Sequence, residues 1–247
     1  MRLIPVLDIA GGVAVHARGG DRRHYAPVRS VLTSAAADPA ELAAAYRRVL
    51  GTSELYVADL DAIEGAPISR VVSDLCGSGS HTWLDAGVSD VAEARVVAGC
   101  GAACVVVGLE TLASRGSLGD IMRTLPSNRV AFSLDLREGV PIVATGSDVA
   151  SDLDGLLEWV GALGIARLIV LDLARVGSGR GIDNQLLRVV RARLPQVELV
   201  AGGGVRDGAD LDVLVGAGCD AALVATALHE GRVTGAELHA GGQWRHR

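Results

Sequence analysis

The sequence predicts an α/β domain of the (β/α)8 type, a TIM barrel formed by residues 1–247, and three observations lead to that prediction. Short apolar segments typical of buried strands alternate with helical segments about eight times, and the connections are mostly short. The chain also repeats itself, because Gly87 and Gly204 are as far apart as Gly101 and Gly218. An open doubly wound sheet is the alternative, but its usual Gly-x-Gly-x-x-Gly after the first strand is absent.

The repeat divides the predicted barrel into two half-barrels, at about residues 1–125 and 126–240. Trp83-Leu-Asp-Ala-Gly-Val-Ser-Asp90 has an apolar start, a Gly-Val step and a following Asp, as does the stretch 199–207. Further upstream, Tyr56-Val-Ala-Asp-Leu60 resembles Ile169-Val-Leu-Asp-Leu173. A repeat on this scale indicates a fold built from similar units.

The expected strands are nearly continuous apolar runs, as strands of a parallel sheet covered on both faces should be. The first is Arg2–Ile9, followed by a short extended piece at Val13–Ala17 and a polar loop over 18–30. Arg137-Glu-Gly139 is expected to turn the chain into a short hairpin around Ile142-Val143, and the last residues, 241–247, are expected to be frayed. The other strands are expected at Glu54–Leu60, Thr82–Asp85, Ala103–Gly108, Val130–Asp135, Arg167–Asp172, Glu198–Ala201 and Ala221–Ala225.

The expected helices follow the strands and carry start signals. Asp38 and Pro39 form an N-cap and a first-turn proline, and Asp90 caps the helix after the third strand. The remaining helices are expected at Ile68–Leu75, Val91–Ala98, Leu118–Thr124, Leu153–Leu163, Asn184–Arg193, Ala209–Gly216 and Thr226–Gly231.

Composition excludes several classes of function. The net charge of −6 gives no electrostatic basis for binding nucleic acid or an anionic membrane. No apolar run reaches the ~18 residues of a membrane span, and the N-terminus lacks the features of a signal peptide. The four cysteines have no metal spacing, which favours reduced thiols and a cytoplasmic protein over disulfides. The chain contains no lysine, so lysine Schiff-base chemistry is excluded.

Aspartates stand at the ends of four predicted strands: Asp8, Asp59, Asp135 and Asp172. The carboxyl ends of barrel strands form the active face of this fold. Asp8 and Asp135 end the first and fifth strands, so they should face each other across the barrel mouth and suit a general base and a general acid. The alternative is that such residues cap the following turn, which we favour for Asp59 and leave open for Asp172.

Three consecutive glycines, Gly202 to Gly204, end the seventh strand, and backbone N–H groups exposed there could hold an anion such as phosphate. One glycine triplet is also explained by a tight turn. Four arginines in the loop 18–30 could clamp a phosphate or simply be solvated.

Several motifs together resemble the histidine-biosynthesis isomerase and cyclase family, whose members are half-barrel-duplicated (β/α)8 enzymes. These motifs are Pro5-Val-Leu-Asp-Ile-Ala-Gly-Gly12, Val57-Ala-Asp-Leu-Asp-Ala-Ile-Glu-Gly65, Leu134-Asp-Leu-Arg-Glu-Gly139, Leu171-Asp-Leu-Ala-Arg175, Ala201-Gly-Gly-Gly-Val205 and Ala227-Leu-His-Glu-Gly231. The resemblance spans nearly the whole chain, and the isomerase branch is the closer one.

The resemblance implies an Amadori aldose-to-ketose rearrangement of a phosphoribosyl substrate, with no metal or organic cofactor. It implies that Asp8 is the base at the ribose C2 proton, that Asp135 is the acid that opens the ring, and that Asp172 supports the substrate. It also implies one phosphate site at Gly177, Gly203 and Gly204 and a second at Gly87 and Gly108, with Thr226 and Arg175 as further binding residues.

The chain departs from the isomerase pattern at the third strand, where Asp85-Ala86-Gly87 replaces a glycine triplet. A carboxylate there would repel a phosphate unless it turned away. This pattern is more similar to isomerase-related proteins associated with tetrahydromethanopterin or methanofuran one-carbon metabolism. The alternatives to the isomerase are therefore such a protein with another phosphorylated ligand, or a barrel that binds a phosphorylated ligand without catalysis.

Overall fold

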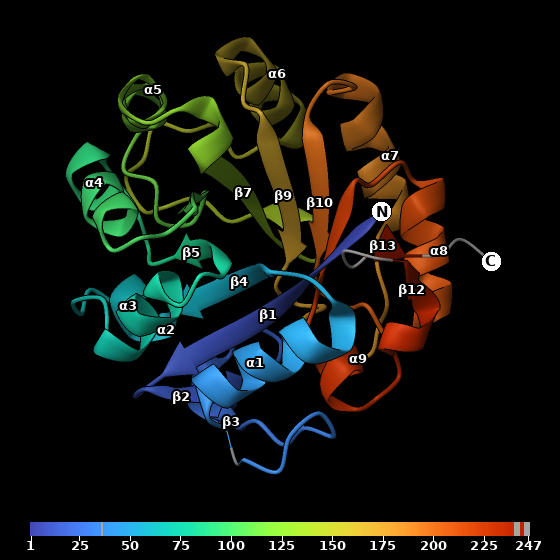
Figure 1. Ribbon diagram of the computed structural model, residues 1–247. Helices are drawn as coiled ribbons and strands as arrows, with labels where there is room; N and C mark the ends of the chain where they lie inside the picture. Colours follow the sequence, from blue (N-terminus) through green and yellow to red (C-terminus); the bar gives the residue numbers. More distant parts are fainter. Residues whose placement is uncertain (36, 240–242, 245–247) are drawn as a thin grey trace.

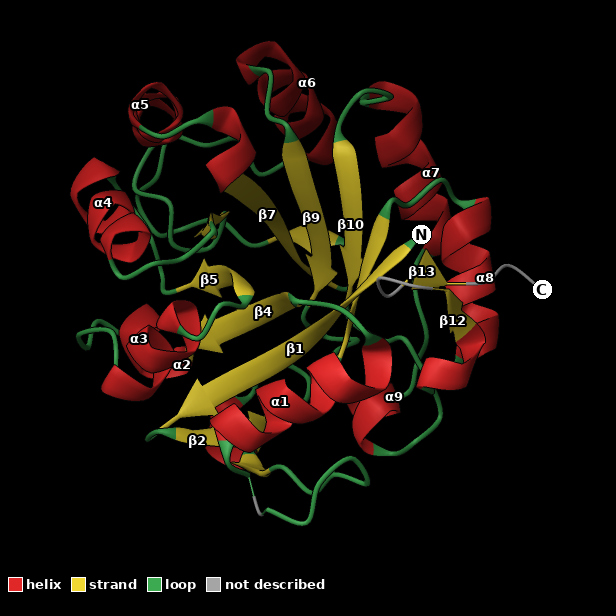
Figure 2. Cartoon of the chain, in the orientation of Figure 1, coloured by secondary structure: helices red, strands yellow, loops and turns green. Residues whose placement is uncertain are grey.

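The computed structural model, which describes residues 1–35, 37–239 and 243–244, is a closed parallel barrel surrounded by helices (Figure 1). Within the described part of the chain, eight strands form the barrel, with the helices in an outer ring (Figure 2). The predicted TIM barrel is confirmed. Its strands are β1 (Arg2–Ala10), β4 (Glu54–Asp59), β5 (His81–Asp85), β6 (Cys104–Gly108), β7 (Val130–Arg137), β9 (Arg167–Asp172), β10 (Glu198–Gly202) and β11 (Ala221–Val224).

The barrel closes because the last strand pairs with the first. β11 and β1 are parallel, with Leu3 opposite Ala222 and Pro5 opposite Val224. On its other edge β1 pairs with β4, with Asp8 opposite Ala58. The remaining neighbours follow chain order from β4 through β5, β6, β7, β9 and β10 to β11. All eight strands therefore end at one rim, which is where this fold places its functional groups.

The helices that cover the barrel begin at the caps that the sequence indicates. Asp38 accepts the N–H groups of Ala40 and Glu41, and Asp90 and Asp207 cap their helices in the same way. The helices are α1 (Pro39–Leu50), α2 (Leu60–Ile63), α3 (Arg70–Gly77), α4 (Val91–Gly99), α5 (Arg115–Thr124), α6 (Leu153–Leu163), α7 (Asn184–Arg193), α8 (Gly208–Gly216) and α9 (Thr226–His229), with 3-10 turns η1 (Arg22–His24), η2 (Ser127–Arg129) and η3 (Gly235–Glu237).

Alternation along the strands divides the core into two parts, because successive side chains of a strand point to opposite faces. One set fills the barrel interior and includes Ile4, Tyr56, Trp83 and Ile169. The other set, including Leu7, packs against the helices. On any strand, a side chain an even number of positions from an interior residue therefore points into the barrel.

Three short strands lie outside the barrel on the active rim. β2 (Val13–His16) pairs with β1, and β3 (Ala26–Pro27) pairs with β2, so the predicted polar loop is partly ordered by pairing. β8 (Val140–Pro141) pairs with the end of β7. The predicted turn at residues 137–139 is confirmed, with positive φ at Glu138 and Gly139, and the returning strand follows it directly, two residues earlier than expected.

The C-terminal segment was expected to be frayed from residue 241 to 247, most of which lies outside the described residues. Gln243–Trp244, however, forms strand β13, which pairs with β12 (Leu238–His239) and with Arg2. Trp244 is buried, and its indole N–H donates to Asp212 Oδ1 at 2.9 Å. Burial of this aromatic side chain explains why the expectation was wrong for these two residues.

The cysteines and the helices agree with two expectations from composition, namely reduced thiols and no apolar run long enough to span a membrane. Cys76, Cys100, Cys104 and Cys219 are free thiols, and all but Cys100 are buried. None of the described helices combines the length and the apolar character needed to cross a membrane.

Candidate active site

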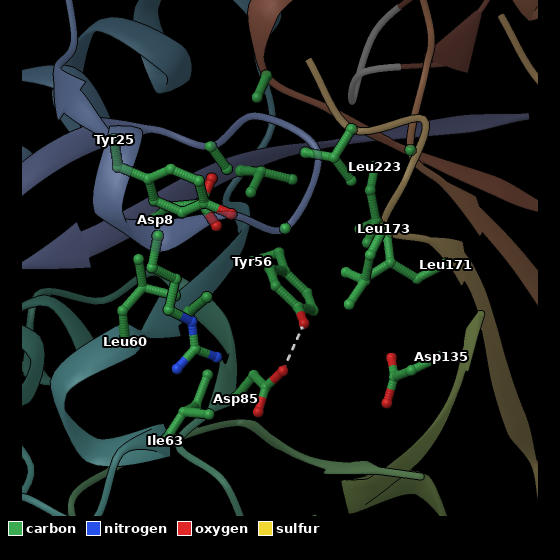
Figure 3. A pocket seen from close by; sticks show the side chains of 18 of the residues that line it. Asp8, Tyr25, Tyr56, Leu60, Ile63, Asp85, Asp135, Leu171, Leu173 and Leu223 are labelled. Atoms are coloured by element: carbon green, nitrogen blue, oxygen red, sulfur yellow. Dashed lines mark hydrogen bonds between the residues drawn. The ribbon is translucent and has the colours of Figure 1, made fainter. Parts of the chain in front are cut away.

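The active rim surrounds a cavity of about 430 Å³. Figure 3 shows Asp8, Asp85 and Asp135 around it, each from a different strand. Each of these residues lies two or four positions beyond an interior residue of its strand, so alternation directs its side chain into the barrel mouth. The polar side chains that line the cavity are Asp8, Arg22, Tyr25, Tyr56, Asp85, Glu110, Thr111, Asp135, Arg137 and Thr226.

Asp8 lies near the end of β1, opposite Val15 of the adjoining β2. Burial, followed by the nearby charge of Asp85, raises the pKa of its carboxyl group to about 7, although Arg22 partly opposes both effects. A carboxyl group that titrates near neutral pH can accept a proton and release it again under ordinary conditions. Asp8 therefore has the properties of a general base.

Asp135 lies on β7, in the fifth barrel strand, and is almost fully buried. The hydroxyl of Ser133 donates to Asp135 Oδ1 at 2.6 Å, and the N–H of Glu110 donates to Oδ2 at 3.3 Å. Burial, followed by the nearby Glu110 carboxylate, raises the pKa of Asp135 well above its usual range. Asp135 is therefore suited to carry a proton at neutral pH and donate it.

Asp85 lies at the end of β5 and was expected to disturb a phosphate site unless its side chain turned away. It does not turn away, because its carboxylate lines the cavity. The hydroxyl of Tyr56 donates to Asp85 Oδ2 at 3.0 Å, and the N–H of Gly87 donates to Oδ1 at 3.3 Å. Burial raises the pKa of Asp85 to about 6, although both hydrogen bonds lower it.

Asp172 lies outside the lining of this cavity. On β9 the interior positions are Ile169 and Leu171, so alternation turns Asp172 toward the loops. Its Oδ1 accepts the N–H groups of Glu138 at 3.1 Å and Ala174 at 3.0 Å, while Arg175 Nε donates to Oδ2 at 3.3 Å. The structure thus pairs the buried Asp172 with the half-buried Arg175, and neither side chain lines the cavity.

Gly203, Gly204 and Thr226 do line the cavity, at the end formed by β10 and β11. A Cβ atom at Gly203 would lie 2.7 Å from the carbonyl oxygen of Asp172, and one at Gly204 would lie 2.4 Å from that of Gly181. Both glycines also have positive φ, of 84° and 104°. The turn therefore requires glycine for steric reasons, and it leaves the backbone accessible from the cavity.

A smaller pocket of about 190 Å³ continues from this end and shares Gly204 and Thr226 with the cavity. Gly177 lines it, as the sequence suggested for a phosphate site. Its charged lining residues are Arg18, Arg206, Glu230 and Arg232. Arg206 is paired with Asp210 and Arg232 with Glu230, so the guanidinium of Arg18 gives this end of the site its net positive charge, which suits an anion.

Gly87 and Gly108, the other predicted phosphate residues, are placed differently. Gly87 lines an adjoining surface pocket beside α4, which shares Ile63 and Thr111 with the cavity, and a Cβ atom at Gly87 would be 2.8 Å from the Cα atom of Ile63. A Cβ atom at Gly108 would lie 3.0 Å from Asp135 Oδ2, so this glycine makes room for the carboxylate. Asp59, in contrast, accepts the N–H groups of Ala62 and Ser69, as expected of a cap.

A closed barrel whose rim gathers acidic side chains and glycine turns over one cavity defines the class of (β/α)8-barrel proteins that bind a small molecule at the carboxyl ends of their strands. More particularly, the chain belongs to the histidine biosynthesis protein family, whose family model matches residues 2–234. The family predicted from the motifs is confirmed.

The relatives found by sequence comparison match over nearly their full length. A Thermus thermophilus protein named 1-(5-phosphoribosyl)-5-((5-phosphoribosylamino)methylideneamino) imidazole-4-carboxamide isomerase is 33% identical over 238 residues, which cover 94% of this chain and 96% of that protein. The Rubrobacter xylanophilus protein of the same name is 32% identical over 246 residues, covering 96% and 94%. The uncharacterized protein MJ0703 of Methanocaldococcus jannaschii is 29% identical over 234 residues, covering 94% of each. The predicted isomerase class agrees with the names of the first two.

Proposed function

We propose that the protein is an isomerase that performs an Amadori-type aldose-to-ketose rearrangement on a phosphoribosyl substrate, with Asp8 as general base and Asp135 as general acid. The observation that carries the proposal is that both carboxyl groups line one cavity, from the first and fifth strands of the barrel. The names of the relatives supply the class of reaction, since those proteins are isomerases of a compound with a phosphoribosylamino group.

In the proposed reaction, Asp135 first donates its proton to the ring oxygen of the ribosylamine. The bond between that oxygen and C1 breaks, and the nitrogen lone pair forms a C1=N iminium. Asp8 then removes the proton on C2, and the electrons of that bond form a C1=C2 enamine as the iminium is neutralised. Return of a proton to C1 and loss of the C2 hydroxyl proton give the aminoketose, so the product is an isomer of the substrate.

The electrostatics of the cavity support this division of roles. Asp8, with a pKa of about 7, is partly ionised at neutral pH and can accept the C2 proton. The pKa of Asp135 is raised well above its usual range, so it keeps a proton to donate. Two carboxyl groups whose environments separate their proton affinities form a typical acid and base pair.

The cationic pocket supports a phosphate position at Gly177, Gly203 and Gly204. Backbone N–H groups at glycine turns and nearby guanidinium groups both favour a phosphate dianion. A phosphate held there would anchor the sugar next to β1, the strand that carries Asp8, because β11 pairs with β1. It would thus fix the sugar relative to the acid and base, which is the positioning that such catalysis needs. We assign Thr226 to the same position because it lines both pockets.

Asp172 and Arg175 have an indirect role in this proposal. Their contacts connect the loop after β9 to Glu138, in the turn that directly follows β7, and β7 carries Asp135. Asp172 would thus support the substrate indirectly, by holding these loops in position. We also keep the cytoplasmic location as a proposal, which the composition supports.

The test is rescue of a histidine auxotroph that lacks the isomerase. Expression of the wild type should restore growth without histidine, and Asp8→Asn and Asp135→Asn should each abolish it. Asp74→Asn, which removes an exposed charge from α3, is the matched control and should rescue fully. Growth that survives both cavity substitutions would contradict the acid–base assignment. A wild type that neither rescues growth nor converts the relatives' compound in vitro would favour a barrel that binds its ligand without this chemistry.

A further inference from the structure

The two ends of the cavity have opposite chemistry. At the end formed by β10 and β11, the glycine turn at Gly203 and Gly204 opens onto the pocket with three arginines. At the end formed by β5 and β6, the cavity is lined by the carboxylates of Asp85 and Glu110. A ligand that spans the cavity therefore meets donors and positive charge at one end and acceptors and negative charge at the other.

The backbone donors at the acidic end already serve carboxylates of the protein itself. The N–H of Gly87 donates to Asp85 Oδ1, and the N–H of Glu110 donates to Asp135 Oδ2. A phosphate placed at this end would have to displace both side chains and would still meet the negative charge of Asp85 and Glu110. Because like charges brought together in a partly desolvated site repel each other, this end selects against a second phosphate.

Two arginines also line the cavity, and they do not reverse this charge pattern. Arg22 Nη1 lies 3.0 Å from Glu64 Oε1, and Arg22 Nη2 lies 3.8 Å from Glu110 Oε1, so acidic partners already share its charge. Arg137 donates to the carbonyl oxygen of Gly19 in the loop after β2.

Tyr56 fixes Asp85 in this position. Its hydroxyl is held in the barrel interior and donates to Asp85 Oδ2 at 3.0 Å. Each carboxylate oxygen thus receives one hydrogen bond from the protein and has a further lone pair available. That lone pair is satisfied by a hydroxyl or amino group of a ligand, and not by a phosphate oxygen.

We propose, building on the isomerase function proposed above, that the substrate is a monophosphate: its single phosphate binds at Gly203 and Gly204, and a hydroxyl or amino group binds Asp85. Asp85 is then a specificity-determining residue. The isomerases among the relatives are named for a compound with two phosphoribosyl groups, so this chain would differ from them in the half of the substrate that meets β5.

The test compares two sugar probes by isothermal titration calorimetry at pH 8, where Asp85 is ionised. D-Ribulose 5-phosphate carries one phosphate, and D-ribulose 1,5-bisphosphate carries a second phosphate in place of a hydroxyl. The wild type should bind the monophosphate about tenfold more tightly, since the second phosphate meets Asp85. In Asp85→Gly and Asp85→Asn this preference should shrink to about threefold or reverse, as the repelling charge is gone. Asp74→Asn should keep it.

The inference is overturned if the wild type binds the bisphosphate at least as tightly, if both Asp85 variants keep the wild-type preference, or if the monophosphate does not bind. Asp8→Asn separates this inference from the proposed function, because binding needs no proton transfer. Asp8→Asn should lose isomerase activity and keep the preference. A wild type that shows the preference but has no isomerase activity would support the substrate class and remove the proposed reaction. A wild type that has isomerase activity but lacks the preference would support the proposed reaction and rule out the monophosphate substrate class.

Discussion

Replacing the proposed base should stabilise the protein, which tests the environment of Asp8 without any substrate. The pKa of Asp8 is raised from 3.8 to about 7, chiefly by burial. A carboxyl group whose pKa is higher in the folded than in the unfolded state favours folding least when it is ionised. Its cost therefore grows as pH rises from about 4 to about 7 and is constant above that range.

The size of the effect follows from the same shift. About three pKa units at about 1.4 kcal/mol each give roughly 4 kcal/mol as an upper value, and water in the cavity reduces it. Asp8→Asn should therefore gain about 1–4 kcal/mol of unfolding free energy at pH 8, or roughly 3–10 °C in Tm for a chain of this size. The gain should shrink toward zero as the pH is lowered to 4.

The assay is thermal unfolding of the wild type and Asp8→Asn at pH 4, 6 and 8, followed by circular dichroism. Asp74→Asn is the control, because Asp74 is exposed on α3 and its loss should change Tm by about 1 °C or less. An Asp8→Asn protein that is no more stable than the wild type at pH 8, or that gains equally at all three pH values, would refute the assigned environment of Asp8.

The remaining predictions concern the turn and the loops beside the cavity. Gly204→Ala should lower the unfolding free energy in urea by about 2 kcal/mol or more, because its φ of 104° and the Gly181 carbonyl oxygen both oppose a Cβ atom. Gly51 has a φ of 65° with open space around it, so Gly51→Ala should lower the unfolding free energy by only about 1 kcal/mol. Equal losses in the two variants would contradict the claim that the Gly181 carbonyl oxygen opposes a Cβ atom at residue 204. Asp172→Ala should cost about 2–4 kcal/mol, since it leaves the N–H groups of Glu138 and Ala174 and the Arg175 side chain without their acceptor. It should also raise KM more than it lowers kcat if Asp172 acts through loop position, and a loss confined to kcat would indicate a direct role.

The positions of the strands, and the pairing of Asp8 with Asp135 at the cavity, could be predicted from the sequence because both follow from local patterns of apolar residues. Apolar runs that end in Asp8 and Asp135 mark strands of the two halves, and the barrel topology then brings their ends to one rim. The structure agrees with the repeat as well, since Gly87 and Gly204 both adopt positive φ and the Asp three residues later caps the next helix in each case.

Strand alternation in the sequence could have shown which aspartates face the cavity and which face the loops, but the prediction from sequence did not use it. Strand alternation places Asp85 on the same face as Trp83, and Asp172 on the face opposite Leu171. Reading that parity would have moved Asp85 into the site and Asp172 out of it. The partners could not be predicted in this way. The Tyr56 hydroxyl comes from the neighbouring strand β4 and the Glu110 N–H from the turn after β6, and the sequence alone does not specify how these segments are aligned.

Proton exchange during turnover tests the central claim most directly. The relatives' phosphoribosylamino compound, incubated with the enzyme in D2O, should give a ketose product with solvent deuterium at C1 when analysed by NMR. Asp8→Asn should reduce the rate of this reaction by about 10²-fold or more, the contribution usual for a positioned base, and Asp135→Asn should slow it similarly. Wild-type rates in either variant would contradict the account of two carboxyl groups acting on one substrate.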